Sequence, residues 1–309
     1  MSLPSQEFEA LVAPHRRELH AYCYRMLGSL QDAEDALQDT LLGAWKGLAG
    51  LEARSALKSW LYRIATNACL RVIEQRPARI LPYDRAPASH GSVVAPIVEG
   101  VPWLDPYPVA LEATFEQRES LELAFVAALQ HLPANQRAAL ILRDVLEFSA
   151  AEAAELLATS VPAINSALQR AKSAVSERIP PLSQQRTLAE LGDTGRQSLV
   201  QAYVNAWAKQ DAQALIALLT EDARFTMPPI PSWFEGREAV VRFFSEPVFR
   251  SSWHLRPTWV SGQLAFAAYM APDFRLGALN VITVRGHKIA EITGFLDPAV
   301  QAFFSLPER

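Results

Sequence analysis

The chain has 309 residues, more than one hydrophobic core usually organises, so its length predicts two or three domains. Half of these residues are apolar and 20% are charged, a balance that excludes a disordered or fibrous protein. The net charge of -4 argues against a protein that binds DNA unaided, because Lys and Arg normally supply most nonspecific affinity for phosphate. Such a chain either does not bind DNA or has a partner that supplies most of the affinity.

Three folded units separated by two connectors describe the chain most simply. Helical periodicity covers 5–76 and returns at 116–179, on either side of an irregular, proline-rich connector at 77–115. A short polar connector at 180–195 opens on two prolines and precedes the third unit. In that unit, 196–309, two helical segments lead into segments rich in β-branched and aromatic residues, so we expect an α+β domain after two all-α domains.

The first unit contains a helix with an acidic face. Asp and Glu fill the opening turn of the stretch 32–45, where a helix N-terminus favours negative charge. Apolar residues at helical spacing can pack inward, whereas a second face is acidic with one apolar anchor. The second face consists of Asp35, Gln38, Asp39 and Leu42. Taken alone, such a face is most simply a solvated one.

The following helix, predicted over 55–76, combines an apolar stripe at helical period with an unusual set of side chains elsewhere. That set joins cations and polar groups to an aromatic ring: Lys58, Tyr62, Arg63, Thr66, Asn67 and Arg71. Rings stack on unpaired bases, and Arg or Lys follows the phosphates, so the mixture suits single-stranded nucleic acid. On these residues alone, a solvated helix face is an equal alternative.

The second unit has the spacing of a helix-turn-helix. Pro133 precedes one helix, Ser149 can cap a short second one, and Ser160 can cap a third that has Pro162 in its first turn. In such motifs the start of the last helix enters the major groove. Its candidate contacts to bases and phosphates are Ala163, Asn165, Ser166, Gln169, Arg170 and Lys172. A helical hairpin in a bundle that does not bind DNA is the alternative.

Three motifs in this order resemble the extracytoplasmic-function (ECF) sigma factors, which are subunits of bacterial RNA polymerase. They are 24–35 with 37–39 and Trp45; 60–67 (WLYRIATN); and 132–137 (LPANQR) with 142–145 and the helix 160–172. The resemblance covers essentially the whole chain and implies a region 2 helical bundle at 5–76 and a region 4 helix-turn-helix at 116–179. It also accounts for the net charge, because the polymerase would supply much of the DNA affinity.

The resemblance implies a partner for each surface. The acidic face of Asp35, Gln38, Asp39 and Leu42 would dock on the coiled coil of the polymerase largest subunit, and the polymerase flap is a further expected contact. The minus-ten element would meet Arg54, Tyr62, Arg63, Asn67 and Arg71, with a flipped base held by the loop 51–55. The minus-thirty-five element would meet Asn165, Ser166, Gln169, Arg170 and Lys172. Family members often carry Lys or Arg at the positions of Asn165 and Ala167, so we expect altered promoter contacts there.

The rest of the chain resembles the subset of these factors that carry a C-terminal SnoaL-like domain. The matching pieces are the linker segment 101–108 (VPWLDPYP) and, in the third unit, 203–207, 218–229, 233–237 and 294–298. The resemblance implies a multidomain protein in which two all-α sigma domains precede an α+β cone of the nuclear transport factor 2 (NTF2) type. We expect that domain to regulate the factor by holding the two DNA-reading units in a chosen geometry through the linker.

The third unit offers candidates for a ligand pocket and for catalysis. Phe225, Met227, Trp233, His254 and Tyr269 could line a pocket for a small apolar ligand, although an aromatic core is the simpler interpretation. The candidate bases are Asp222, His254 and Asp297. Each has an ordinary structural explanation, a helix-to-strand turn, a core histidine and a helix cap respectively, so no catalytic residue is expected.

Other features narrow the partners. The two cysteines fit no metal-ligand spacing, so neither a metal nor a cofactor is expected. Neither a secretion signal nor an apolar stretch of about 20 residues is present, so we expect a cytoplasmic protein without a membrane partner. No feature identifies an anti-sigma factor.

Two other functions stay open. A conventional helix-turn-helix regulator with a ligand-binding C-terminal domain would bind duplex DNA without polymerase. A SnoaL-like isomerase or cyclase would need nothing before residue 195 for turnover. We prefer the sigma factor because it alone accounts for all three units.

Overall fold

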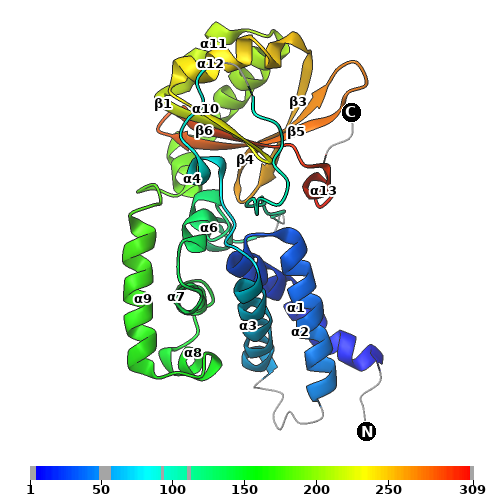
Figure 1. Ribbon diagram of the computed structural model, residues 1–309, viewed down its shortest axis with the longest axis vertical. Helices are drawn as coiled ribbons and strands as arrows, with labels where there is room; N and C mark the ends of the chain where they lie inside the picture. Colours follow the sequence, from blue (N-terminus) through cyan, green and yellow to red (C-terminus); the bar gives the residue numbers. More distant parts are fainter. Residues whose placement is uncertain (1–4, 49–56, 92–93, 110–112, 307–309) are drawn as a thin grey trace. The chain divides into compact units, whose positions relative to one another are not determined.

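The computed structural model describes residues 5–48, 57–91, 94–109 and 113–306 (Figure 1). The chain divides into two compact units. The first comprises Met1–Arg79 and Leu123–Pro180, and the second comprises Ile80–Glu122 and Pro181–Arg309. Among the described helices, none is long and apolar enough to span a bilayer. Each unit is therefore assembled from two separate pieces of the sequence.

The first unit begins with a bundle of three helices, drawn in blue in Figure 1. They are α1 (Ser5–Leu27), α2 (Leu30–Gly47) and α3 (Leu57–Gln75). Ser29 caps α2 by accepting a hydrogen bond from the backbone N–H of Asp32 at 3.4 Å. The buried Asp32 carboxylate also pairs with Arg76 and Arg79, which follow α3. These ion pairs join the end of the third helix to the start of the second.

The second half of this unit is the expected helix-turn-helix. It contains α6 (Leu123–Gln130), α7 (Ala134–Leu140), the π-helical turn η3 (Ile141–Val145), α8 (Ala150–Leu156) and α9 (Val161–Ser176). Ser149 and Glu152 form a reciprocal capping box at the start of α8. Ser160 caps α9, with Pro162 in its first turn. The caps thus lie where the sequence predicted them.

The second unit is built on one six-stranded sheet. Its helices are α10 (Gln184–Ala208), α11 (Ala212–Leu218), α12 (Arg237–Ser245), η4 (Val248–Arg250) and α13 (Pro298–Gln301). Its strands are β1 (Leu219–Met227), β2 (Ile230–Glu235), β3 (Trp253–Val260), β4 (Gln263–Met270), β5 (Arg275–Arg285) and β6 (Lys288–Phe295). The strand order is β2-β1-β6-β5-β4-β3, and only β1 and β6 pair in parallel.

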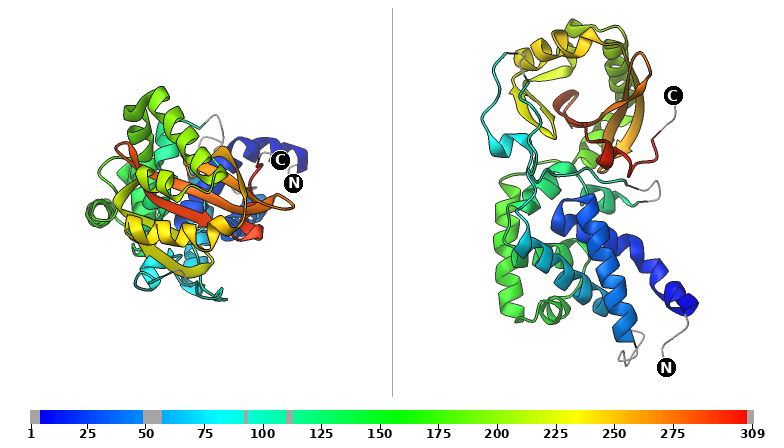
Figure 2. Two further views of the ribbon diagram at one scale, coloured as in Figure 1. Left: turned by 90° about the horizontal axis from the view of Figure 1, so that it is seen from above. Right: turned by 45° about the vertical axis from the view of Figure 1, so that its right-hand side comes forward.

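Helices α10, α11 and α12 lie on one side of this curved sheet, as Figure 2 shows on the right. The core between them is aromatic. Trp207 of α10 meets Phe244 of α12 edge to face, with ring centroids 5.1 Å apart, and Phe225 of β1 meets the same Phe244 at 4.9 Å. This aromatic packing holds the helices against the sheet of the α+β cone.

Helix α10 begins earlier than the sequence predicted, inside the expected connector 180–195. Ser183 caps it by accepting from the backbone N–H of Arg186 at 3.2 Å, and Leu188 is buried in the core of the second unit. The helix is interrupted at Gly192, whose φ of 67° favours glycine. The cap and one buried leucine therefore extend the domain through most of that connector.

The proline-rich connector is also part of the second unit. It contains α4 (Pro82–Arg85) and α5 (Phe115–Glu119), and Ile80 forms a β-bridge with Trp103. Its backbone is hydrogen-bonded to the sheet domain at three places. The N–H of Ser89 donates to the Trp233 carbonyl (2.7 Å), and the N–H of Ala95 donates to Ser232 Oγ (2.8 Å). The N–H of Tyr107 donates to Ser261 Oγ (2.9 Å), and the N–H of Ser261 donates back to the Tyr107 carbonyl (2.8 Å). The proline-rich connector is thus bound to the sheet domain through its backbone.

The side chains of α4 complete this attachment. The Tyr83 ring packs edge to face on Trp233, with centroids 6.0 Å apart, and lies 4.6 Å from the Arg224 guanidinium. Arg224 pairs at 2.9 Å with Glu291 on the neighbouring strand, and burial raises the pKa of that carboxyl. The Trp233 indole N–H donates to the Ala86 carbonyl at 2.7 Å. The linker is therefore held by ring contacts with Trp233 and with Arg224, whose ion pair to Glu291 is half-buried, as well as by backbone bonds.

Candidate polymerase and nucleic-acid surfaces

The acidic face predicted on α2 is present and exposed. Asp35, Gln38, Asp39 and Leu42 all lie on the solvent side, while Ala33, Ala36 and Leu37 on the other side are buried. The Leu42 side chain is 57% exposed. We call this set of four residues the docking face. Covering this leucine with a partner would remove apolar surface from water.

The predicted nucleic-acid face of α3 is only partly exposed. Arg63, Asn67 and Arg71 follow each other at intervals of four residues and share an exposed side. The Arg71 guanidinium lies 4.0 Å from the Asp39 carboxylate, with both groups largely in solvent. Arg54 and the loop 51–55 lie outside the described residues. The three exposed residues form one cationic strip with an amide at its centre.

Tyr62 corrects one prediction, because it does not face solvent. Its ring is fully buried between Tyr22 and Phe148, with ring centroids at 5.3 Å and 5.2 Å. Its hydroxyl lies 3.4 Å from the Glu18 carboxylate, and burial raises the pKa of the phenol. The helical period placed position 62 beside the apolar stripe but did not show that Phe148 would cover it.

Helix α9 presents the predicted polar residues to solvent. Asn165, Ser166, Gln169, Arg170 and Lys172 are all exposed, whereas Ile164, Ala171 and Val175 are buried. The Arg170 guanidinium donates to Ser166 Oγ, one turn earlier on the same helix, at 2.8 Å. Lys172 pairs with Asp144 of η3 at 2.9 Å. Thus one of the two cations of this face already has a carboxylate partner.

Arg137 is a buried structural residue that the sequence analysis did not single out, although it ends the LPANQR motif. Only 3% of it is exposed. Its guanidinium donates to the carbonyls of Met26, Gln130 and Leu132 and to Gln130 Oε1, and Gln130 Nε2 in turn donates to the Arg25 carbonyl at 3.2 Å. Arg25 and Met26 lie in the last turn of α1, whose carbonyls have no partner within the helix. Burial lowers the pKa of this guanidinium to about 10.

The five residues predicted for a ligand pocket do not come together. Phe225 and Met227 belong to the core under the helices, whereas Trp233, His254 and Tyr269 lie on the opposite face of the sheet. His254 is exposed, which corrects the expectation of a core histidine. Strand alternation accounts for the split, since neighbouring strand residues point to opposite faces.

The candidate bases have structural partners or lie in solvent. The exposed Asp222 is paired with Arg285, which lowers the pKa of that carboxyl to about 2. Asp297 caps α13 by accepting from the backbone N–H of Ala299 at 2.8 Å. Within the described ranges no group of three His, Cys, Asp or Glu side chains is placed to hold a metal ion.

Three polar atoms in the cone core were not anticipated from the sequence. Tyr203 Oη and Trp207 Nε1 of α10 and Asn280 Nδ2 of β5 are buried, and none of them makes a hydrogen bond of ordinary geometry within the described residues. The three groups are neighbours, since burial raises the pKa of the Tyr203 hydroxyl and Trp207 and Asn280 partly offset that rise. Tyr203 also packs on Phe266 of β4, with ring centroids 4.6 Å apart. Unpaired polar atoms in a core cost stability, so they mark positions where function competes with folding.

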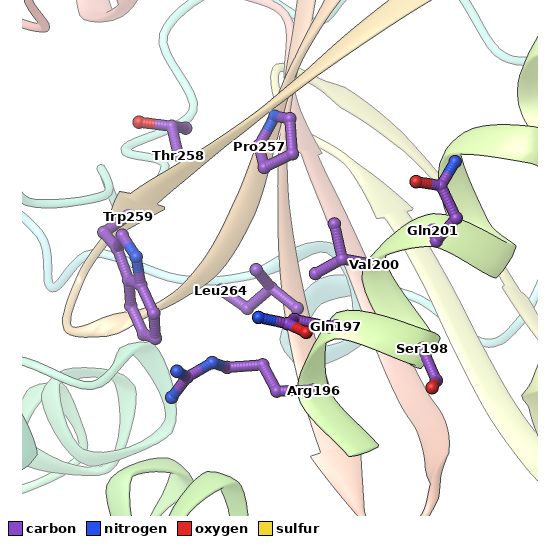
Figure 3. Close-up of a pocket in the computed structure, with 9 residues that line it drawn as sticks. All are labelled: Arg196, Gln197, Ser198, Val200, Gln201, Pro257, Thr258, Trp259 and Leu264. Atoms are coloured by element: carbon purple, nitrogen blue, oxygen red, sulfur yellow. The ribbon is translucent and has the colours of Figure 1, made fainter. Parts of the chain in front are cut away.

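A groove of about 570 Å³ lies between α10 and the strands β3 and β4 (Figure 3). It is lined by Arg196, Gln197, Ser198, Val200, Gln201, Pro257, Thr258, Trp259 and Leu264. Val200 precedes Tyr203 by three residues on α10, and Leu264 precedes Phe266 by two on β4, so both pairs share a face. The apolar floor of the groove therefore lies beside the three unpaired polar atoms.

Comparisons with known proteins match three families along this chain. Residues 11–78 match the Sigma-70 region 2 family, residues 122–175 match Sigma-70 region 4, and residues 200–292 match the SnoaL-like domain family. The region 2 match covers the three-helix bundle, the region 4 match covers α6 to α9, and the third match covers most of the cone.

Curated relatives match all or part of this chain. The ECF RNA polymerase sigma factor SigG of Mycobacterium tuberculosis is 38% identical over 98% of this chain and 84% of its own length. SigM of the same species is 32% identical over 54% of this chain and 74% of its own length. The crystal structure of the M. tuberculosis ECF sigma factor SigJ covers 98% of this chain and 100% of its own, with a TM-score of 0.64 and 23% identity, and so shows the same fold.

Proposed function

This chain belongs to the extracytoplasmic-function family of RNA polymerase sigma factors, and from that premise we propose a role for each of its exposed surfaces. A sigma factor binds core polymerase and directs it to promoters. The docking face of Asp35, Gln38, Asp39 and Leu42 would bind the coiled coil of the largest subunit. Its carboxylates suit a basic partner, and Leu42 supplies an apolar anchor that is uncovered in the free chain.

The exposed polar strips of α3 and α9 are the proposed promoter contacts. Arg63, Asn67 and Arg71 would meet the minus-ten element, where cations follow phosphate and an amide can bond a base edge. Asn165, Ser166, Gln169, Arg170 and Lys172 would meet the minus-thirty-five element, with region 4 also touching the polymerase flap. Lys172 would have to exchange Asp144 for a phosphate, which lowers its expected contribution.

The docking face is tested by binding to bacterial core polymerase. We expect the native chain to bind and the Asp39→Ala plus Leu42→Ala variant to lose at least tenfold in affinity, which corresponds to roughly 1.4 kcal/mol. A matched control is Glu190→Ala plus Leu182→Ala, which also removes an exposed acid and an exposed leucine but lies in the second unit. Equal binding by the two double variants would refute the docking face, and no binding by the native chain would refute the sigma function.

The C-terminal domain is proposed to regulate the factor through the ends of region 4. Both Glu122 carboxylate oxygens accept backbone N–H groups at the start of α10, from Gln184 at 2.8 Å and Gln185 at 2.9 Å. Nearby, Glu119 accepts from Ser183 and pairs with Arg186 at 3.3 Å. We call these contacts the clasp. Residues 123–180 leave the second unit just after Glu122 and return just before Ser183, so the clasp holds both ends of region 4 together.

A small ligand is a second proposed input to this domain. The unpaired Trp207 Nε1 and Asn280 Nδ2 are donors, and Tyr203 Oη can donate or accept, so together they would bind an acceptor atom of an otherwise apolar molecule. We propose binding rather than turnover. Asp222 is held by Arg285, Asp297 is committed to a helix cap, and His254 is exposed on the other face of the sheet.

A further inference from the structure

An aromatic residue of region 4 covers part of the α3 face proposed for promoter DNA. The Phe148 ring, between η3 and α8, packs edge to face on Tyr62 with centroids 5.2 Å apart. Lys58, one turn before Tyr62, places its ammonium 5.6 Å from the centroid of the same ring. Both rings are buried, Tyr62 completely and Phe148 to all but 6%. The Tyr62 ring therefore has no free face on which an unpaired base could stack.

The position of Phe148 is fixed by its own loop. Its backbone N–H donates to the Leu142 carbonyl at 2.9 Å, and the Arg143 guanidinium donates to its carbonyl. Glu147, just before it, adopts a positive φ of 58°, a conformation that costs energy outside glycine and persists only where surrounding contacts enforce it. Phe148 is therefore held toward α3 by the turn that begins α8.

A second contact joins the same two regions away from α3. Arg137 and Gln130 of region 4 satisfy the carbonyls of Arg25 and Met26 at the end of α1. Exposed ion pairs contribute little, but hydrogen bonds from buried side chains to backbone carbonyls form a specific contact. Regions 2 and 4 thus meet at two separate, buried points within one compact unit.

We propose that this packing is a closed state of the sigma factor, in which Phe148 masks Tyr62 and must leave α3 before that segment can meet promoter DNA. The inference rests on the proposed minus-ten role of α3. Arg63, Asn67 and Arg71 stay exposed in the closed state. They would supply a first electrostatic contact, and stacking on Tyr62 would follow the departure of Phe148.

The test locks the closed state in the full-length chain with a covalent bridge. Lys58 of α3 and Glu152 of α8 both lie beside Phe148, because the Lys58 ammonium is 5.6 Å from the Phe148 ring centroid and Glu152 accepts from the backbone N–H of Ser149, the next residue, at 2.7 Å. Replacing both with cysteine retains the Phe148 ring itself. A short bismaleimide should bridge the Lys58→Cys plus Glu152→Cys variant, while each single variant cannot form the bridge. The native Cys23 and Cys69 are buried and should not react.

Two measurements decide the outcome: the rate of bridging and the level of initiation. Adding Phe148→Ala to the pair should slow bridging at least threefold, because the closed state is less populated, whereas adding Phe115→Ala at an exposed ring should not. After bridging and addition of core polymerase, initiation should fall at least tenfold relative to the unbridged pair. A pair that does not bridge, or a bridged chain that initiates within twofold of the unbridged one, overturns the closed state.

A separate variant distinguishes this failure from a failure of the proposed minus-ten role. If Arg63→Ala plus Asn67→Ala abolishes initiation while the bridged chain stays active, α3 reads the promoter but needs no opening. If that variant initiates normally, α3 does not contact the promoter, and the packing of Phe148 on α3 would not affect DNA binding. Loss of initiation both in this variant and in the bridged chain supports the two proposals together.

Discussion

Two buried polar side chains of this protein, Arg137 and Asn280, differ in how many hydrogen-bond partners they have. Arg137 in region 4 meets three carbonyls and an amide oxygen, so the cost of removing its charge from water is largely repaid. Asn280 in the cone core is different, because its Nδ2 makes no hydrogen bond of ordinary geometry within the described residues. A donor left unpaired in a core costs about 1–3 kcal/mol. Arg137 is therefore explained by folding, whereas Asn280 is one of the residues on which the proposed ligand site rests.

The Asn280→Leu variant tests that distinction. Leucine has nearly the same shape and no polar atom, so we expect the free energy of unfolding to rise by about 1 kcal/mol in urea titrations. The exposed Asn205→Leu on α10 is the control and should change it by less than ~0.5 kcal/mol. A fall of 1 kcal/mol or more for Asn280→Leu would mean that the amide is paired in solution, which would remove the main support for a ligand site.

At the scale of secondary structure, the clasp caps the start of α10 and is also the contact proposed to regulate region 4. The first N–H groups of α10 have no partner within the helix, and the Glu122 carboxylate takes two of them. The helix N-terminus favours the negative charge, but burial opposes it more strongly and raises the pKa of Glu122 to about 7. The clasp therefore depends on a group that titrates near neutral pH.

This gives the clasp a pH dependence of definite sign. An unfolded glutamate titrates near 4.3, so the folded chain holds the proton more tightly. The contribution of Glu122 to stability is full below that pH and is lost as the pH rises toward about 7. Glutamine stays neutral throughout. The free energy of unfolding of Glu122→Gln minus that of the native chain should therefore rise by roughly 2 kcal/mol as the pH increases from about 5 to about 8.

The same variant reports on regulation. In reconstituted initiation at a pH where Glu122 is charged, Glu122→Gln should change promoter activity at least twofold if the clasp restrains region 4. Glu116→Gln on α5 removes an exposed carboxylate one turn away and should follow the native chain in both assays. A constant difference in stability across pH would contradict the buried-carboxylate argument, and unchanged initiation across several promoters would contradict the regulatory role.

The sequence predicted those elements whose signals are local. Apolar period and capping residues placed the helices of both sigma regions, and the fold class is confirmed. What it missed depends on contacts between distant residues. Tyr62 is buried by Phe148, 86 positions away in the 309-residue chain, and the linker is ordered by Trp233 and Ser261 of the cone. A proline-rich composition predicts a segment without regular secondary structure, but it does not show whether that segment packs on another domain.

At the scale of the whole molecule, charge and family membership become consistent. A chain with net charge -4, in which one of the two cations on the polar face of α9 is already paired, has little electrostatic attraction for DNA. A polymerase partner removes this difficulty, since the sigma factor then needs to supply sequence choice more than affinity. The closed packing of regions 2 and 4 acts in the same direction, because it withholds Tyr62 from DNA in the free chain.

The free chain should accordingly bind DNA weakly. By fluorescence anisotropy at physiological salt, we expect the chain alone to bind duplexes with a Kd of ~1 µM or weaker, in the nonspecific range. With core polymerase, the promoter that supports the strongest initiation should be bound at least a thousandfold more tightly. Nanomolar, sequence-specific binding by the free chain would instead favour a conventional helix-turn-helix regulator, because such a protein must carry its full DNA affinity on its own surface.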